Sequence, residues 1–181
     1  SYTPTSGEYI AYIGRLSYEK GYDLLVEVAR KHPEIKFCFA GAQREKNNTE
    51  IPKNVEFKGY LQKKELSKFI QESRFIVIPS RCYEGFPMAI LEAACHGKPA
   101  IAPNHGGFTE IIGQGENAIG KLFEPGNTDD LDKQIAELWN NQTLTEELGE
   151  KAFKKLKKHY DSEVVYKQWE TLFSKLKNSW H

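Results

Sequence analysis

No excess of charge of either sign is present in the sequence, because 25 lysines and arginines balance 25 aspartates and glutamates. A chain without net charge produces no long-range field that would draw it to nucleic acid or to an anionic membrane. We therefore predict no nucleic-acid partner, and any site for an anion must be local.

Cysteine is also scarce. The three cysteines, Cys38, Cys82 and Cys95, are odd in number and lack the spacing of zinc ligands, and Cys38 lies inside an apolar run typical of a strand. These features argue against a disulfide framework and against a metal site. We expect the reduced thiols of a cytosolic protein.

Long apolar runs are missing too. No stretch approaches the length needed to span a bilayer, and residues 1–7 lack the charged and then apolar pattern of a signal peptide. We expect a soluble protein in the cytoplasm, either free or peripheral at the inner face of the membrane.

The sequence does contain an alternation of short apolar runs and longer helical patterns up to about residue 140. This alternation is typical of repeated strand–helix–strand units, so we predict an α/β fold with a doubly wound parallel sheet and helices on both faces. About six strands are expected, at 9–14, 35–40, 55–58, 75–79, 99–102 and, more weakly, 118–123. The predicted crossover helices are 21–30, 63–72, 87–95 and 128–139.

After Asn140 the strand patterns stop, and two further helices are predicted at 144–159 and 162–180. The whole chain, 1–181, fits a single domain with extra C-terminal helices. The polar stretch 43–53 is predicted to be a surface loop.

Ligands of a doubly wound sheet bind where the carboxyl ends of strands meet helix N-termini. The first such junction carries Gly14, Arg15, Lys20 and Gly21 around a helix start. Gly14 would let a phosphate approach the backbone, and the two cations could neutralise a diphosphate. Because short Gly-Arg and Lys-Gly pairs are common, this junction taken alone is better explained as a charged surface turn.

The second junction, 79–94, runs from an apolar strand into a helix and is more specific. Gly85 permits a tight turn and Pro87 suits the first helical position, which leaves free backbone amides for a sugar or a phosphate. Glu84 precedes the helix and Glu92 lies about one and a half turns inside it, so both carboxylates could face one cleft.

Two carboxylates beside an anion would repel it. They could instead accept hydrogen bonds from the hydroxyl groups of a ligand. One could bind a hexose and the other a ribose, with a diphosphate between amides and cations, which is the charge distribution of a nucleotide sugar. The alternative is that Glu84 is a loop carboxylate and Glu92 a solvent-facing helix residue, as in most isolated acidic pairs. Their place at this junction favours the binding role.

Several short motifs follow one another over residues 10–138. They are Gly14-Arg15-Leu16 with Glu19-Lys20-Gly21, Val55-Glu56-Phe57-Lys58-Gly59, Pro79-Ser80, Glu84-Gly85-Phe86-Pro87, Glu92-Ala93 and Gly106-Gly107-Phe108-Thr109-Glu110. In these motifs and in their order, the sequence resembles glycosyltransferase family 4. The most specific element is the pair Glu84 and Glu92, with seven residues between them.

This resemblance implies the GT-B architecture of two Rossmann-like lobes, in which the C-terminal lobe mainly holds the donor and the N-terminal lobe mainly holds the acceptor. By the resemblance, this chain is the C-terminal lobe, and one of its partners is its own N-terminal lobe. The acceptor is unknown, with a glycan or a lipid-linked glycan among the candidates. The resemblance also implies retention at the anomeric carbon, no cofactor and no essential metal.

The resemblance further implies roles for individual residues. Arg15 and Lys20 match the residues that stabilise the departing diphosphate, and Glu84 matches the sugar-contacting glutamate, so these three are the predicted catalytic residues. Glu92 matches the ribose-binding glutamate. The other predicted donor-binding residues are Gly14, Gly85, Phe86, Pro87, Met88 and Ala89 near the sugar and phosphates, and Tyr60 and Leu61 near the base.

One departure from the family concerns Pro87, because many members have a second glycine there. The proline could narrow the donor-sugar pocket, which leaves the donor sugar open. Cys82 lies in a variable part of the motif without a partner base, so we interpret it as an ordinary thiol near the site.

Several other residues suggest sites that their context disfavours. Cys95, His96 and His105 form no ligand quartet, because adjacent residues on a helix point in different directions. The run Asn127-Thr128-Asp129-Asp130 precedes a helical pattern and suits helix capping better than metal binding. The basic stretch 151–159 could touch acidic lipid or an acidic partner, but a solvated helix face explains it more simply.

We therefore predict a retaining hexosyltransferase that moves a sugar from a nucleoside diphosphate sugar, such as a UDP-sugar, to an acceptor in carbohydrate biosynthesis. Its catalysis would be largely electrostatic, and this chain would bind the donor but be inactive alone. The alternatives are a nucleotide-sugar epimerase, a phosphorylase, which would need a pyridoxal-binding lysine, and a non-catalytic nucleotide-sugar-binding module.

The last predicted helix carries a broad apolar stripe. We expect part of the stripe to lack cover in this chain, against the alternative that the helix packs wholly onto its own domain. The stripe consists of Val165, Trp169, Leu172, Phe173, Leu176 and Trp180.

Overall fold

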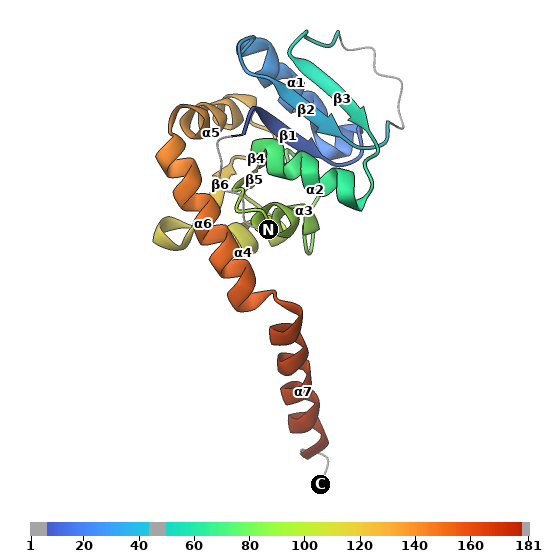
Figure 1. Cartoon of the computed structure of the whole chain (residues 1–181), viewed down its shortest axis with the longest axis vertical. Helices are drawn as coiled ribbons and strands as arrows, with labels where there is room; N and C mark the ends of the chain where they lie inside the picture. The colour runs from blue at the N-terminus through green and yellow to red at the C-terminus, as the bar shows by residue number, and fades with distance from the viewer. Residues whose placement is uncertain (1–6, 44–49, 179–181) are drawn as a thin grey trace.

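The computed structural model describes residues 7–43 and 50–178. In this part of the chain, six parallel strands form one sheet in the order β3-β2-β1-β4-β5-β6 (Figure 1). The strands are β1 (Tyr9–Ile13), β2 (Phe37–Ala40), β3 (Val55–Gly59), β4 (Ser73–Val77), β5 (Ala100–Pro103) and β6 (Gly120–Phe123). This is the strand order of the Rossmann fold, and it confirms the predicted α/β class.

The described residues also form seven α-helices and two short 3-10 turns. The helices are α1 (Tyr22–Lys31), α2 (Lys63–Glu72), α3 (Met88–Ala94), α4 (Gly106–Ile112), α5 (Thr128–Asn140), α6 (Gln142–His159) and α7 (Ser162–Asn178). The 3-10 turns are η1 (Tyr18–Lys20) and η2 (Gly115–Asn117).

Helices cover both faces of the sheet, as predicted (Figure 1). Successive side chains of a strand point to opposite faces. On β1, Ile10 and Tyr12 are buried in the core that contains the apolar residues of α1 and α5. Ala11 is buried in the opposite core, which contains apolar residues of α2, α3 and α4. The sheet is therefore buried between two apolar layers, as expected for parallel strands.

Local sequence explains where several elements begin. The helix predicted at 63–72 coincides with α2, whose start carries a capping box between Gln62 and Glu65. The side chain of Asn127 accepts hydrogen bonds from the amides of Asp129 and Asp130 at the start of α5, which confirms the capping role. The strand predicted at 75–79 lies two residues earlier, because Ser73 already pairs with β1.

Helix α4 was not predicted. It begins with Gly106 and Gly107, and glycine has a low helix propensity, so the helical spacing of Phe108, Ile111 and Ile112 covers little more than one turn. Tertiary burial of Phe108, Ile111 and Ile112 stabilises the helix instead.

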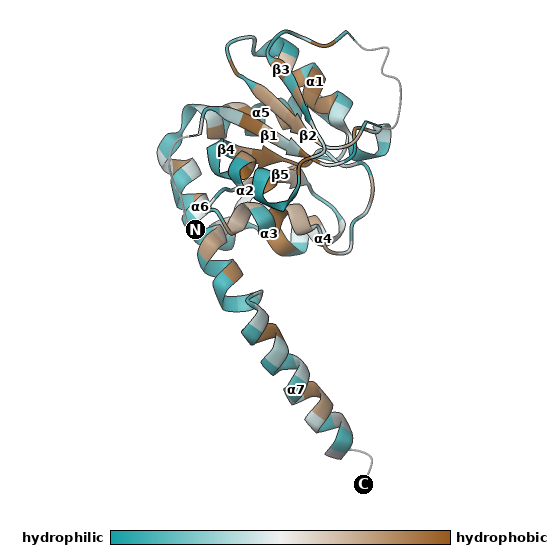
Figure 2. Ribbon diagram, turned by 45° about the vertical axis from the view of Figure 1, so that its right-hand side comes forward, coloured by the Kyte–Doolittle hydropathy of each residue, from teal (hydrophilic) through white to brown (hydrophobic). Residues whose placement is uncertain are grey.

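Helix α7 runs away from the body of the domain, with polar and apolar residues along its length (Figures 1 and 2). Trp169, Leu172 and Phe173 are exposed by 54%, 46% and 61%. The predicted lack of cover is thus confirmed at these positions, and the alternative of packing wholly on the domain is wrong. The side chain of Leu176 and all of Trp180 lie outside the described part.

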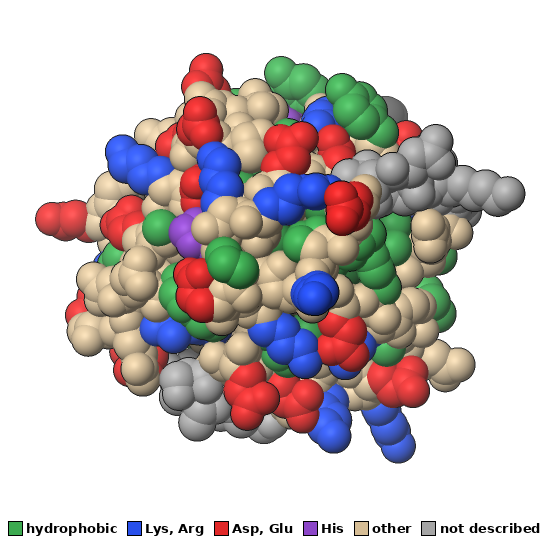
Figure 3. All heavy atoms as spheres, turned by 90° about the horizontal axis from the view of Figure 1, so that it is seen from above, with side chains coloured by type: hydrophobic (Ala, Val, Ile, Leu, Met, Phe, Trp, Pro, Cys, Tyr) green, Lys and Arg blue, Asp and Glu red, His purple; other side chains and the backbone are tan. Residues whose placement is uncertain are grey.

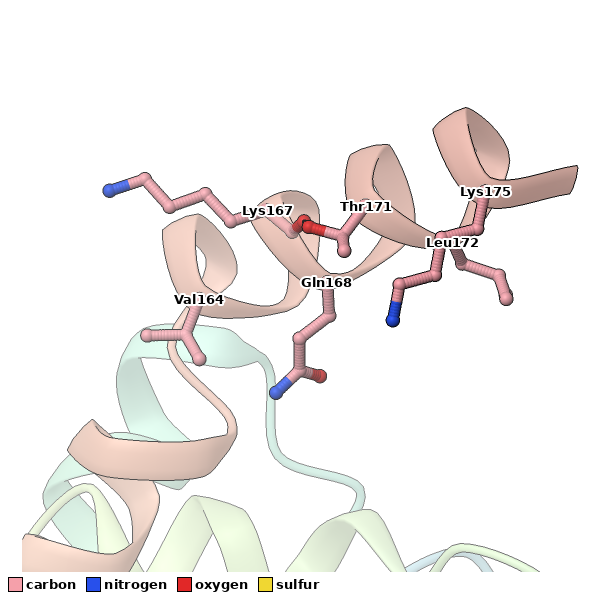
Figure 4. Close-up of a pocket in the computed structure, with 6 residues that line it drawn as sticks. All are labelled: Val164, Lys167, Gln168, Thr171, Leu172 and Lys175. Atoms are coloured by element: carbon pink, nitrogen blue, oxygen red, sulfur yellow. The ribbon is translucent and has the colours of Figure 1, made fainter. Parts of the chain in front are cut away.

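A hollow of about 420 Å³ lies on α7, but it does not cover the apolar residues of this helix (Figure 4). Within the described residues, α7 alone lines it, so no other element forms an opposite wall. Its lining residues are Val164, Lys167, Gln168, Thr171, Leu172 and Lys175.

The surface mixes charges of both signs on the face seen in Figure 3, in keeping with the zero net charge. None of the described helices has the length and apolar character needed to cross a bilayer. Most of the predicted loop 43–53 lies outside the described residues.

Candidate functional site

The two junctions singled out from the sequence lie next to each other in the structure. From β1 the chain continues to β2 and β3 on one side, and it then crosses to β4 on the other side of β1. The carboxyl ends of β1 and β4 are thus neighbours whose connections leave in opposite directions. Doubly wound folds bind their ligands at this position.

Close backbone contact and one arginine hold the two junctions together. Gly21 has a φ of 69°, and a Cβ atom there would lie 1.8 Å from the carbonyl oxygen of Pro79. Arg81 donates two hydrogen bonds of 2.7 Å to the carboxylate of Asp23, and its guanidinium lies 4.0 Å from the ring centroid of Tyr18. The role of Arg81 could not be predicted, because no local pattern places it beside a residue 58 positions away.

Lys20 and Glu84, both predicted as catalytic, form an ion pair across the two junctions. Their Nζ and Oε1 atoms are 2.6 Å apart, and each side chain is one-quarter exposed. Arg15, the third predicted catalytic residue, lies 2.6 Å from Glu19 in a pair that is nearly half exposed. Such an exposed pair contributes little to stability, so the guanidinium can readily exchange partners.

A cavity of about 330 Å³ lies beside the first junction. Gly14 and Arg15 form one side of it, and Tyr60 and Leu61, which follow β3, form another. The structure therefore brings four of the predicted donor-site residues to one cavity. Its volume is at the lower end of the range for small-molecule sites.

The second junction differs in one detail from the prediction. Helix α3 begins at Met88, so Pro87 is its N-cap rather than its first helical residue. Proline has no polar side chain, and no side chain caps the helix. In the described residues, the amides of Gly85 and Phe86 donate to no backbone carbonyl. Free donors therefore lie at the turn where they were predicted.

The exposed and buried residues of this turn alternate. Phe86 and Met88 are exposed, Pro87 is buried and Ala89 is half-buried. The ring of Phe86 lies 5.7 Å from that of Tyr160, which follows α6. Phe86 and Met88 thus offer apolar surface beside the turn.

Glu92 lies on α3 and is half-buried. Burial raises the pKa of its carboxyl group, because the charged form loses solvation. A partly buried carboxylate gains most from a hydrogen-bond donor that a ligand supplies. That Glu92 and Glu84 face one cleft stays a prediction.

The start of α4 packs against the backbone of the Glu84 turn. The amide of Gly107 donates a 2.8 Å hydrogen bond to the carbonyl oxygen of Glu84. A Cβ atom at Gly107 would lie 2.3 Å from the carbonyl oxygen of Gly85, so the close approach requires glycine. Gly107 therefore has a packing function here.

His105 precedes α4 and stacks on Tyr83, with ring centroids 4.5 Å apart. Both of its ring nitrogens are buried without a hydrogen-bond partner among the described residues. His96 instead lies 3.1 Å from the hydroxyl of Ser67. Over residues 7–43 and 50–178, no group of three His, Cys, Asp or Glu side chains gathers that could hold a metal ion.

A comparison with protein families and one with individual proteins agree with each other. A family model described as "Glycosyl transferases group 1" matches residues 2–155. An uncharacterised glycosyltransferase of Methanocaldococcus jannaschii is 34% identical over 147 residues, which are 77% of this chain and 40% of that protein. The sulfoquinovosyl transferase SQD2 of Arabidopsis thaliana is 31% identical over 175 residues, which are 93% of this chain and 32% of that protein.

Among solved structures, TarM matches with a TM-score of 0.77 and 27% identity, over 93% of this chain and 35% of that one. A mutant of TarM from Staphylococcus aureus, in complex with UDP among other ligands, matches with a TM-score of 0.76, 27% identity and coverage of 96% and 36%. The chain spans about a third to two fifths of the length of these relatives. From the family model and these relatives we conclude that the chain belongs to the glycosyl transferases group 1 family.

Proposed function

We propose that this chain is the donor-binding lobe of a retaining family 4 glycosyltransferase and binds a nucleoside diphosphate sugar between the ends of β1 and β4. The observation that carries the proposal is the Lys20–Glu84 ion pair, which joins the two junctions at 2.6 Å. It places a cation and a hydrogen-bond acceptor side by side, and a diphosphate next to a sugar hydroxyl needs both.

The nucleoside would occupy the cavity lined by Gly14, Arg15, Tyr60 and Leu61. Tyr60 is 77% exposed, so its ring is free to stack on a base. Glu92 would accept hydrogen bonds from the ribose hydroxyls. A ribose that donates to this partly buried carboxylate would offset its lost solvation.

The diphosphate would lie between Arg15, Lys20 and the free amides of the 85–89 turn. Arg15 would leave Glu19 for the phosphate, which presents a matching pair of oxygens to the guanidinium fork. These donors would stabilise the charge that develops on the leaving diphosphate as the bond to the sugar breaks. Glu84 would orient the sugar through a hydroxyl group.

The relatives support this assignment. SQD2 is named a sulfoquinovosyl transferase, and the TarM mutant structure holds UDP. Because the chain spans only part of these proteins, we propose that an N-terminal lobe binds the acceptor and that the chain alone transfers no sugar.

A ligand-detected NMR screen of UDP-, GDP- and ADP-sugars against this chain tests the proposal. We expect saturation transfer to one class of nucleotide sugar, and competition by its free nucleoside diphosphate. The Lys20→Met and Glu92→Ala variants should lose the signal. Saturation transfer that persists in both variants, or no transfer to any of the three classes, would contradict the proposed site.

A further inference from the structure

A second cavity lies between α6 and the η2 turn, away from the β1–β4 edge. Its volume is about 400 Å³, and α6 contributes Lys151, Lys154, Lys155 and Lys158 to its wall. Residues three and four apart lie on one face of a helix, so these lysines point to the same side of α6. Among the described residues of the lining, Glu116 supplies the one carboxylate.

Two of these lysines, the exposed Lys151 and the half-buried Lys155, contact backbone carbonyl groups beside the cavity. Lys151 donates a 3.2 Å hydrogen bond to the carbonyl oxygen of Glu116, and Lys155 donates one of 2.6 Å to that of Ile111. Both acceptors are neutral, so neither contact compensates the ammonium charge. Because an ammonium group has three donors, each lysine retains donors for a ligand.

The charge of the other two lysines is only partly balanced. Lys154 pairs with Glu150 at 2.6 Å on the same helix. No hydrogen bond or ion pair involves Lys158 in the described part of the chain. The cavity therefore holds more positive than negative charge, although the whole chain is neutral.

Lys155 adds a reason for an anion to bind here. It is half-buried, and burial lowers the pKa of its ammonium group, with Glu110 opposing this effect. An anion in the cavity would offset the lost solvation of this charge. A solvated helix face, the simpler explanation of the basic stretch, fits the exposed Lys151, Lys154 and Lys158. It does not explain the half-buried Lys155, whose ammonium group donates to the carbonyl oxygen of Ile111.

We propose that this lysine cavity is a binding site for a phosphate-bearing ligand. Several ammonium groups around one hollow suit a phosphate, whose oxygens accept hydrogen bonds from several directions. The phosphate could belong to a lipid headgroup or to a free phosphate compound. Both share the chemistry that the lysines recognise.

The lysine cavity is separate from the proposed donor site, although α4 connects them. Gly107 at the start of α4 contacts Glu84, and Ile111 near its end contacts Lys155. The two contacts are about 6 Å apart along the helix axis, given its rise per residue. The proposal does not depend on the donor function, since no predicted donor residue lines the cavity.

The test uses two probes with the whole chain: inorganic phosphate, followed by amide chemical shifts, and vesicles of phosphatidylcholine with or without phosphatidylglycerol, followed by sedimentation. We expect phosphate to shift the amides of 116–119 and of α6, or the anionic vesicles to bind the chain. The double variant K151Q/K158Q should weaken binding of the effective probe at least tenfold. The probe that binds identifies the source of the phosphate.

The matched control is K53Q/K133Q, which removes the same charge from two exposed lysines elsewhere. It should change binding less than twofold. Equal losses in both double variants would show nonspecific attraction and overturn the proposal, as would no binding of either probe. If K151Q/K158Q failed to fold, shifts in the unmodified chain that avoid 116–119 and α6 would also overturn it.

Discussion

Glu84 and Glu92 occupy different surroundings, and this difference predicts different roles. Glu84 pairs with Lys20, whereas Glu92 is half-buried on α3. We expect Glu92→Ala to weaken binding of both the free nucleotide and the nucleotide sugar, and Glu84→Ala to weaken mainly that of the sugar-bearing ligand. Each lost charged hydrogen bond should reduce binding by about 1.5 to 3 kcal/mol. Dissociation constants of both ligands in both variants measure this, and equal losses in all four pairings would refute the division.

Lys98 predicts a pH dependence of stability. It is 2% exposed, and burial lowers the pKa of its ammonium group to about 8. An unfolded lysine keeps its proton to about pH 10.4, so between these values the unfolded state binds more protons. Stability from this group should therefore rise with pH across that window, by up to about 3 kcal/mol, and the burial penalty should be fully present below pH 8.

The comparison with Lys98→Met isolates this effect. Burial raises the pKa values of Tyr9, Tyr12, Cys38 and Cys95, which opposes the trend in the intact protein but is shared by the variant. Urea unfolding of both proteins at pH 7 and pH 10 gives the difference. Parallel changes in the two proteins would mean that Lys98 is not the group responsible.

Some residue contacts could not be predicted from the sequence. The motifs identified Lys20 and Glu84, but their pairing depends on the neighbouring positions of β1 and β4 in the sheet. The contacts of Arg81 and His105 were not predicted for a related reason. Their partners, Asp23 and Tyr83, lie beside them only after the strands are assembled.

In helix α4, Gly107 is required for close packing against the Glu84 turn. We expect Gly107→Ala to destabilise the chain by about 1 to 3 kcal/mol, because its Cβ would lie 2.3 Å from the Gly85 carbonyl oxygen. This steric cost should exceed the gain in helix propensity. Gly85→Ala is the control, since a Cβ there meets no atom within 4 Å. Thermal unfolding midpoints that are equal in the two variants would disprove this packing role.

Helix α7 predicts an unequal accessibility of the tryptophans. Trp169 is 54% exposed, whereas Trp139 is partly buried with the Arg74 guanidinium 4.8 Å from its ring centroid. Replacing Trp169 by Phe should lower the average quenching of tryptophan fluorescence by acrylamide, because an exposed tryptophan is lost. Replacing Trp139 by Phe should raise this average, because a partly buried tryptophan is lost. Identical quenching constants in the two variants would indicate that α7 is covered, for example by self-association.

Element boundaries followed local patterns where those patterns were strong. The amphipathic spacing and capping box of α2 fixed its limits, and the apolar runs located the strands to within about two residues. Helix α4 has only a short pattern of this kind, in Phe108, Ile111 and Ile112, and it depends on the tertiary burial of these residues. Periodicity therefore located the equally short α3, which begins with Met88 and Ala89, but not α4, which begins with two glycines of low helix propensity.

For the whole molecule, the strand order places both motif-bearing junctions at one edge of the sheet. The fold class followed from the alternation of strands and helices. The motifs indicated a glycosyltransferase, and the family model confirms this at the level of the glycosyl transferases group 1 family. The lysine cavity could not be predicted, because α6 and the η2 turn come together only in the folded chain.

We propose that side chains and backbone amides, without a metal, bind a nucleoside diphosphate sugar between β1 and β4. Titration calorimetry with the nucleotide sugar selected by the NMR screen tests it most directly, in EDTA and in magnesium or manganese. We predict weak binding with the same dissociation constant in all three conditions, because Arg15, Lys20 and the 85–89 turn neutralise the diphosphate. Binding that appears only with the added metal would contradict the claim.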